Sequence, residues 1–151
     1  MKKNIIVGQS GGPTAVINAS LYGVIKEGIA HGDQIGAVYG MIHGIEGFMA
    51  GRVMELSALE EEELELLKLT PAAYLGSCRY KLPAIHEDQS VYEKIFAILD
   101  KLDIEAFIYI GGNDSMDTIK KLSDYAIVTG HPTRFIGSVS YTHLTLPTNR
   151  E

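Results

Sequence analysis

The residues best suited to chemistry follow one another at positions 111–115, with the sequence Gly-Gly-Asn-Asp-Ser. They come directly after an apolar run at 106–110 and directly before a segment with helical spacing, so they mark the end of a buried strand that turns into a helix. Backbone N–H groups at a helix N-terminus favour an anion, and carboxylate oxygens bind hard cations. The pattern predicts a site for a phosphate group and Mg²⁺, with an Asx-capped helix start as the alternative.

A second glycine-rich turn occupies positions 8–14, between a β-branched run at 5–7 and a helical pattern that extends to Ala30. Gly11 and Gly12 let the backbone approach a phosphate closely. The turn lacks the lysine of a P-loop and the glycine spacing of a dinucleotide-binding loop, and a plain strand-to-helix turn is the alternative. Two such loops on parallel strands converge at one edge of a sheet, which favours a shared anion site.

A third candidate segment, 76–81, carries Arg79 and Lys81 among small residues. An arginine can hold a phosphate with two hydrogen bonds, whereas a solvated basic loop is the other explanation. Cys78 is the only cysteine in the chain, so no intrachain disulfide can form, which is typical of a reducing cytoplasm. The histidines show no metal-binding spacing, and His43 is interpreted as structural.

Strands and helices alternate along the chain, and this order predicts how the candidate loops are held. Expected strands lie at 5–7, 35–39, 106–110 and 135–137, and expected helices at 14–30, 60–68, 90–102 and 115–125. A capping box, Ser90 with Glu93, is expected to begin the third helix, and 40–51 is interpreted as a glycine-rich connection. The alternation predicts an α/β fold with a mainly parallel, doubly wound sheet.

The composition narrows the class of protein. The chain has 151 residues, 46% of them hydrophobic and 21% charged, which fits one soluble globular domain. A net charge of -6 argues against a nucleic-acid partner. No apolar run approaches the roughly 20 residues that span a bilayer, and the N-terminus lacks the apolar segment of a signal peptide. We therefore expect a cytoplasmic protein without a membrane partner.

Taken together, these motifs resemble the phosphofructokinase family. The matching motifs are Ser10-Gly11-Gly12-Pro13 with Asn18, Tyr39-Gly40 with Gly44-x-x-Gly47-Phe48, Leu75-Gly76-Ser77-Cys78-Arg79, and Gly111-Gly112-Asn113-Asp114-Ser115. They occur in the family's order across residues 1–137. The resemblance implies a phosphofructokinase-like N-terminal domain that binds the phosphoryl donor at Gly11, Gly12, Arg79 and Asp114. It also implies Mg²⁺ at Asn113, which stands where the family usually has a magnesium-linked Asp, or at Asp114.

The same resemblance implies a transferase, a kinase of glycolysis that phosphorylates the 1-hydroxyl of fructose 6-phosphate to give fructose 1,6-bisphosphate. Members that use ATP have Asp where this chain has Pro13 and Gly where it has Asp114, and a carboxylate at the second position disfavours the α-phosphate of a nucleotide. We therefore expect pyrophosphate as the donor and a homo-oligomer as the assembly. The ATP-dependent reaction is the alternative, and a non-catalytic phosphate- or nucleotide-binding module is a second one.

Residues 138–151 do not continue the pattern. The family's catalytic loop, whose Asp takes the proton from the sugar hydroxyl, is expected directly after Gly137, but Ser138 begins a segment with no helical period. The run at 139–144 resembles a sequencing adapter translated in frame. We expect residues 1–137 to be an incomplete, truncated donor-binding domain and 138–151 to be a non-native tail. On this interpretation the chain is an inactive fragment without its catalytic base.

Overall fold

Strands and helices alternate along most of the described chain, as the sequence predicts, and η1, α3 and α4 follow one another between β3 and β4. The computed structural model describes residues 3–10, 15–67, 75 and 82–139. In chain order the elements are β1 (Lys3–Gln9), α1 (Ala15–Ala30), β2 (Ile35–Met41), α2 (Gly44–Met49), β3 (Val53–Glu55), the 3-10 turn η1 (Leu56–Ala58), α3 (Glu61–Leu67), α4 (Gln89–Lys101), β4 (Ile104–Gly111), α5 (Asn113–Thr129) and β5 (Arg134–Val139).

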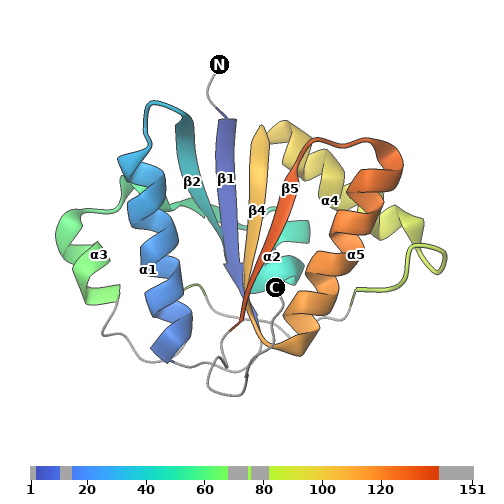
Figure 1. Ribbon diagram of the computed structural model, residues 1–151, viewed down its shortest axis with the longest axis horizontal. Helices are drawn as coiled ribbons and strands as arrows, with labels where there is room; N and C mark the ends of the chain where they lie inside the picture. The colour runs from blue at the N-terminus through green and yellow to red at the C-terminus, as the bar shows by residue number, and fades with distance from the viewer. Residues whose placement is uncertain (1–2, 11–14, 68–74, 76–81, 140–151) are drawn as a thin grey trace, which may run out of the picture.

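The strands form one sheet in the order β3-β2-β1-β4-β5 (Figure 1). β1 pairs in parallel with β2 and β4, β4 pairs in parallel with β5, and the short β3 is antiparallel to β2. This is the mainly parallel α/β fold that the sequence predicts. The strand order reverses at β1, because β2 lies on one side of it and β4 on the other. Open α/β sheets bind ligands beside the carboxyl ends of the strands at such a point.

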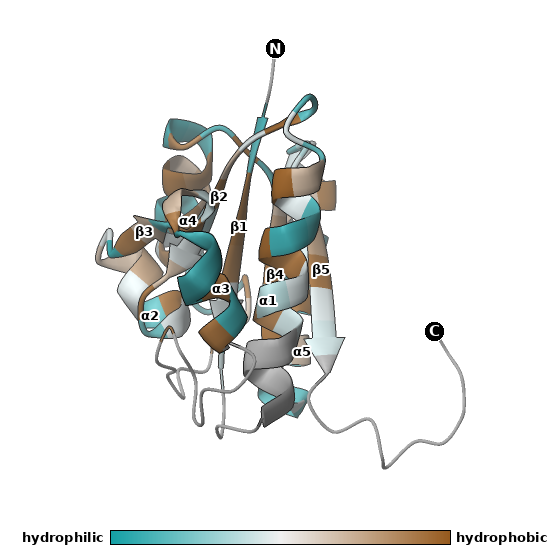
Figure 2. Ribbon diagram, turned by 90° about the vertical axis from the view of Figure 1, so that its left-hand side faces the viewer, coloured by the Kyte–Doolittle hydropathy of each residue, from teal (hydrophilic) through white to brown (hydrophobic). Residues whose placement is uncertain are grey.

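Helices lie on both faces of the sheet. Successive residues of β1 point to opposite faces, so Ile5 packs with α1 and α3, and Ile6 packs with α2, α4 and α5. Figure 2 shows the same separation, with a hydrophobic β1 inside and a mainly hydrophilic α3 outside. Each fully buried aliphatic side chain contributes about 1.5–3 kcal/mol. None of the helices in the described ranges is both long and apolar enough to cross a membrane.

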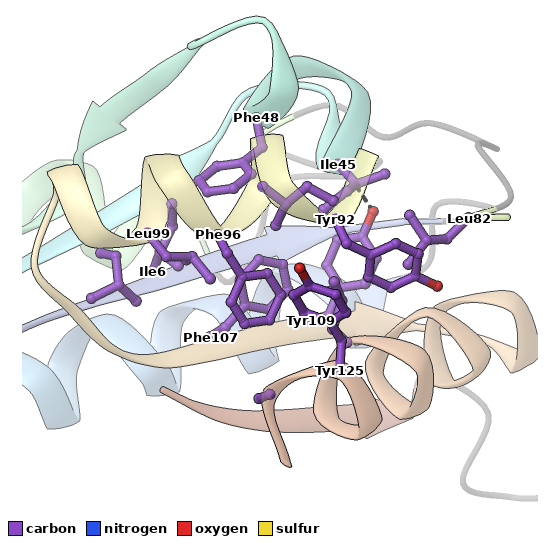
Figure 3. Close-up of a cluster of buried hydrophobic side chains, with 14 of the residues drawn as sticks. Ile6, Ile45, Phe48, Leu82, Tyr92, Phe96, Leu99, Phe107, Tyr109 and Tyr125 are labelled. Carbon is purple, nitrogen blue, oxygen red and sulfur yellow. Dashed lines mark hydrogen bonds between the residues drawn. The ribbon is translucent and has the colours of Figure 1, made fainter. Parts of the chain in front are cut away.

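The larger of the two cores is built around aromatic side chains (Figure 3). Phe107 of β4 meets Phe48 of α2 edge-on with ring centroids 5.9 Å apart, and Phe96 of α4 lies 4.8 Å from Tyr125 of α5. Such pairs add about 0.5–1.5 kcal/mol to the area that they bury. The cluster therefore fixes β4 against the helices on this face, and β4 carries the 111–115 motif at its end.

The interpretation of 40–51 as a connection is incomplete, because this stretch contains the six-residue helix α2 and β3 follows it. His43 and Gly44 turn the chain into α2 with φ angles of 60° and 62°. A Cβ on Gly47 would overlap the carbonyl oxygen of Ile42. The glycines that suggested a loop therefore permit a tight turn into a short helix.

The capping box predicted at Ser90 is wrong. α4 begins at Gln89 and its N-cap is Asp88, whose carboxylate accepts the backbone N–H of Ser90 at 3.1 Å. Asp and Ser are comparable caps, so the sequence offers both, and the geometry selects the earlier residue. α5 also begins earlier than expected, at Asn113 rather than at residue 115.

β5 extends past the expected boundary at residue 137. Ser138 and Val139 pair with Ile110 and Gly111 of β4. The stretch predicted to be a non-native tail therefore starts with two residues of the sheet, while residues 140–151 lie outside the described part of the chain. The domain boundary and the origin of the tail stay predictions.

Candidate functional site

The ends of β1 and β4 lie side by side at the carboxyl edge of the sheet. Gln9 pairs with Ile110, and the backbone N–H of Ser10 donates to the carbonyl oxygen of Ile110 at 2.9 Å. The turn after β1 therefore starts beside the turn after β4, as the sequence predicts for two parallel strands. Gly11 and Gly12 come next in the chain and lie outside the described residues, so their contact with a donor stays a prediction.

Asn113 and Asp114 are the first two residues of α5, and their side chains are exposed. Gly112 occupies the N-cap position and has no side chain with which to cap the helix. The alternative in which an Asx side chain caps the helix is therefore wrong. The positive end of the α5 dipole instead lies beside the end of β1, where it favours an anion.

Ser115 is the residue that the sequence-based assignment omitted. It lies in the first turn of α5, is 1% exposed, and its hydroxyl has no hydrogen-bond partner among the described residues. Gly111 makes this position possible, because a Cβ there would overlap the Ser115 hydroxyl and come within 2.7 Å of the Ser10 carbonyl oxygen. A buried polar group left unpaired costs about 1–3 kcal/mol, so an acceptor oxygen of a ligand would be favoured here.

The segment that carries Arg79 starts from a residue fixed to the site. The backbone N–H of Leu75 donates to the side-chain oxygen of Gln9 at 2.8 Å. The carbonyl oxygen of Leu75 accepts the backbone N–H of His43 at 2.9 Å, so the backbone of His43 has a structural role. Leu75 is thus held between the end of β1 and the turn after β2. Arg79 itself lies outside the described residues, and its contact with a phosphate stays a prediction.

The other end of this segment is fixed to α5. Lys121 donates a hydrogen bond to the carbonyl oxygen of Leu82 at 2.7 Å. Leu75 belongs to the core on the α1 face of the sheet, and Leu82 belongs to the core on the α5 face. Leu75 and Leu82, the described residues that border 76–81, therefore lie in the cores on opposite faces of the sheet.

The turn after β2 is also joined to β4. The backbone N–H of Ile45, in the first turn of α2, donates to the hydroxyl of Tyr109 at 3.0 Å, as the dashed line in Figure 3 marks. Tyr109 is 1% exposed and lies two residues before Gly111. The ends of β1, β2 and β4 are thereby connected by hydrogen bonds at the edge that holds the candidate site.

The described residues can supply part of a magnesium site. Within them, no group of three or more His, Cys, Asp or Glu side chains is placed to hold a metal ion. Asp114 is the acidic residue in the first turn of α5, and Asn113 precedes it with an amide oxygen. Mg²⁺ commonly takes one or two carboxylates and completes its shell with water and phosphate oxygens. These side chains therefore fit an ion that arrives with a phosphorylated ligand.

Comparison with known proteins finds relatives across most of the chain. The phosphofructokinase family model matches residues 4–142. A pyrophosphate--fructose 6-phosphate 1-phosphotransferase of Halomonas elongata is 42% identical over 85% of this chain and 31% of its own length. An ATP-dependent 6-phosphofructokinase of Aliivibrio salmonicida is 34% identical over 82% of this chain and 36% of its own length. The chain thus spans about a third of the length of these relatives.

A solved structure has the same fold over most of this chain. The crystal structure of a pyrophosphate-dependent phosphofructokinase from Marinobacter aquaeolei is 41% identical and superposes with a TM-score of 0.80. The match covers 89% of this chain and 32% of that chain. The sheet and helices described above are therefore shared with one region of a longer protein.

Proposed function

Because the chain belongs to the phosphofructokinase family, we propose that it forms the donor-binding part of a pyrophosphate-dependent 6-phosphofructokinase. The whole reaction would move a phosphoryl group from pyrophosphate to the 1-hydroxyl of fructose 6-phosphate. The family also implies a catalytic base and residues that bind the sugar phosphate, and we assign neither role to a described residue. We therefore propose that the chain alone binds the donor without turnover.

The observation that carries this proposal is the start of α5, with glycine at its N-cap, beside the end of β1. The positive end of the helix dipole lies there, and so does the buried Ser115 hydroxyl, which has no partner among the described residues. The backbone N–H groups of a helix start and a hydroxyl donor both favour an oxyanion. Together they support a phosphoryl group as the ligand.

The residues assigned from the sequence complete this site in the proposal. Gly11 and Gly12 would donate backbone N–H groups to the donor, and Arg79 would hold it with a bidentate contact. Asn113 or Asp114 would hold Mg²⁺, which neutralises phosphate charge when it is bound. Phosphoryl transfer depends mainly on positioning and charge stabilisation, so these roles suit the donor half of the reaction.

Asp114 supports pyrophosphate over ATP as the donor. Its carboxylate is exposed in the first turn of α5, at the edge of the sheet where the donor would bind. Negative charge and side-chain volume there disfavour the α-phosphate and nucleoside of ATP, and pyrophosphate has neither group. ATP-dependent transfer on the same fold is the second candidate, because the Aliivibrio salmonicida relative is named for it.

The localisation, assembly and partners of the protein are proposed from the same family resemblance. We propose a cytoplasmic, magnesium-dependent homo-oligomer that acts on fructose 6-phosphate. The net charge of -6 supports the absence of a nucleic-acid partner, because phosphate backbones bind basic surfaces. No membrane partner is proposed.

Calorimetric titration of the 151-residue chain with Mg²⁺-pyrophosphate and with Mg²⁺-ATP tests the proposal. We expect pyrophosphate to bind more tightly and Asp114→Gly to narrow or reverse this preference. Asp124→Gly is the matched control, since Asp124 is exposed further along the same helix and pairs with Lys120 at 3.0 Å. A chain that binds neither compound contradicts the donor site, and a donor preference that Asp114→Gly leaves unchanged contradicts the role of Asp114.

A further inference from the structure

His131 lies where α4, α5 and the start of β5 meet. Gly130 ends α5 with a φ of 72°, and the backbone N–H of His131 donates to the carbonyl oxygen of Ala126 at 2.9 Å. The imidazole ring packs edge-on against Phe96 of α4, with ring centroids 4.8 Å apart. The His131 side chain is 14% exposed, so both helices hold the ring in place.

Both nitrogens of this ring have partners. The backbone N–H of Thr133 donates to Nδ1 at 3.2 Å, and Nε2 lies 2.7 Å from Oδ1 of Asp100. A backbone N–H can only donate, so Nδ1 must present its lone pair and the ring proton must be on Nε2. The two contacts therefore assign the neutral tautomer of His131 whose N–H donates to the Asp100 carboxylate.

A second proton on the ring would remove one of these contacts. Both nitrogens of an imidazolium are donors, so an Nδ1–H would face the Thr133 N–H and their hydrogen bond would break. The contact with Asp100 suits either form, because a carboxylate accepts from a neutral or a charged ring. The bond from Thr133 is thus the contact that depends on the protonation of His131.

Other titratable and charged groups surround this junction. Those that line the two cavities beside it are Glu93, Asp100 and Tyr125 in one cavity and Lys3, Glu105 and Arg134 in the other. Of these residue types and histidine, only histidine ordinarily changes its charge between about pH 5 and 8. Mild acid is therefore expected to act on the ring.

We propose that His131 is a pH-sensitive junction, which holds the backbone at the start of β5 only while its ring is neutral. Thr133 directly precedes β5, the edge strand beside β4. When the ring gains a proton, the Thr133 N–H loses its acceptor. The Thr133 hydroxyl still donates to the carbonyl oxygen of Ile104 at 2.8 Å, so the release is local. This junction lies at the amino ends of the strands and is independent of the donor site proposed above.

Hydrogen exchange of the 151-residue chain tests the junction between about pH 8 and about pH 5. The protection factor of the Thr133 amide should fall about fivefold or more on acidification, because the amide loses one hydrogen bond. Nitrogen NMR of the ring should show its proton on Nε2 at the higher pH and a second proton on Nδ1 as the protection falls. The Ala37 amide is the internal control, since it donates to the side-chain oxygen of Asn4 at 2.8 Å and this acceptor does not titrate. Its protection factor should change less than about twofold.

His131→Asn separates the ring proton from the other effects of acid. The asparagine oxygen can take the place of Nδ1 as the acceptor of the Thr133 N–H, but it does not titrate. The protection factor of Thr133 in this variant should change less than about twofold over the same pH range. His31→Asn is the matched control, because His31 is an exposed histidine whose Nδ1 lies 2.9 Å from the carbonyl oxygen of Glu27. It should keep the wild-type response.

Each other result overturns the proposal. Thr133 protection that is independent of pH would show that the ring does not control this amide, and so would a wild-type response in His131→Asn. A ring proton on Nδ1 near neutral pH contradicts the assigned tautomer. An equal fall in protection at Ala37 would mean that acid loosens the whole sheet. If His131→Asn does not fold, the wild-type chain decides, because the fall at Thr133 and the ring titration must then share one midpoint.

Discussion

Replacing Ser115 with alanine should stabilise the free chain and weaken its affinity for the phosphoryl donor. The side chain is 1% exposed and its hydroxyl is unpaired among the described residues. Removing such a group recovers about 1–3 kcal/mol, and alanine is the better helix former by about 0.5 kcal/mol. The loss of the packing contacts of one oxygen atom offsets part of this stabilisation. We expect a net increase of about 1–2 kcal/mol in the free energy of unfolding.

Urea denaturation measures this gain, and Thr133→Val is the control with the opposite sign. Thr133 is 5% exposed, and its hydroxyl donates to the carbonyl oxygen of Ile104 at 2.8 Å. Losing that bond should lower the free energy of unfolding by about 0.5–1.5 kcal/mol. In calorimetry with Mg²⁺-pyrophosphate, Ser115→Ala should weaken binding about tenfold or more, the equivalent of one hydrogen bond to a charged group. Thr133→Val should bind as the wild type does.

Two results would refute this reasoning. If Ser115→Ala loses as much stability as Thr133→Val, the hydroxyl has a partner within the protein and is not held for a ligand. If Ser115→Ala gains stability but keeps its affinity for Mg²⁺-pyrophosphate, the hydroxyl is unpaired and the donor does not use it.

Other substitutions test the close packing around the site. Gly111→Ala should lower the free energy of unfolding by about 1–3 kcal/mol, because the added methyl group overpacks the site. Gly23→Ala is the control: a Cβ there meets open space in α1, so this change should raise the free energy of unfolding by about 0.5–1 kcal/mol. Urea denaturation measures both. Tyr109→Phe removes the acceptor of the buried Ile45 N–H and should lower the free energy of unfolding by about 1–3 kcal/mol. Tyr22→Phe loses an exposed hydrogen bond to Glu65 and should lower it by about 0.5 kcal/mol or less in the same assay. A chain that ends at residue 139 should match the stability of the 151-residue chain within about 0.5 kcal/mol, and one that ends at residue 137 should unfold at a lower temperature, because it lacks two paired residues of β5.

The main elements of the fold could be predicted because each is long enough to show its hydrophobic period. α4 and α5 repeat apolar residues over 13 and 17 positions, and the eight residues of β4 include the apolar run at 106–110. α2 and β3 have six and three residues, too few for a period, and their glycines favoured a loop. The cap of α4 was misplaced because Asp88 and Ser90 both have suitable side chains, and only the backbone geometry selects one.

The place of the 111–115 motif in the fold was predictable from the sequence, but the contacts around it were not. The 111–115 motif indicated a strand end that turns into a helix, and the structure places Asn113 and Asp114 there. The bond from Leu75 to Gln9 joins positions 66 apart and has no local signal, since a glutamine at the end of a strand has many other uses. That the Ser115 hydroxyl has no partner among the described residues was also beyond prediction, because this depends on how segments far apart in the sequence, such as those of Ser10 and Gly111, pack together.

The place of β1 in the sheet constrains the order in which this region can assemble. β1 comes first in sequence among the five strands but lies in the middle of the sheet, and its neighbours β2 and β4 begin at Ile35 and Ile104. Asn4 reaches Leu102 across 98 positions, and contacts over such separations form slowly because the intervening loop must close first. During synthesis β1 can pair with β2 while its opposite edge is still unpaired, because β4 has not yet been made. The proposed anion site needs the turns after β1 and β4 together, so it can form only once β4 has docked. A bound phosphate can therefore stabilise the finished domain by mass action, but it cannot guide the earlier steps of its folding.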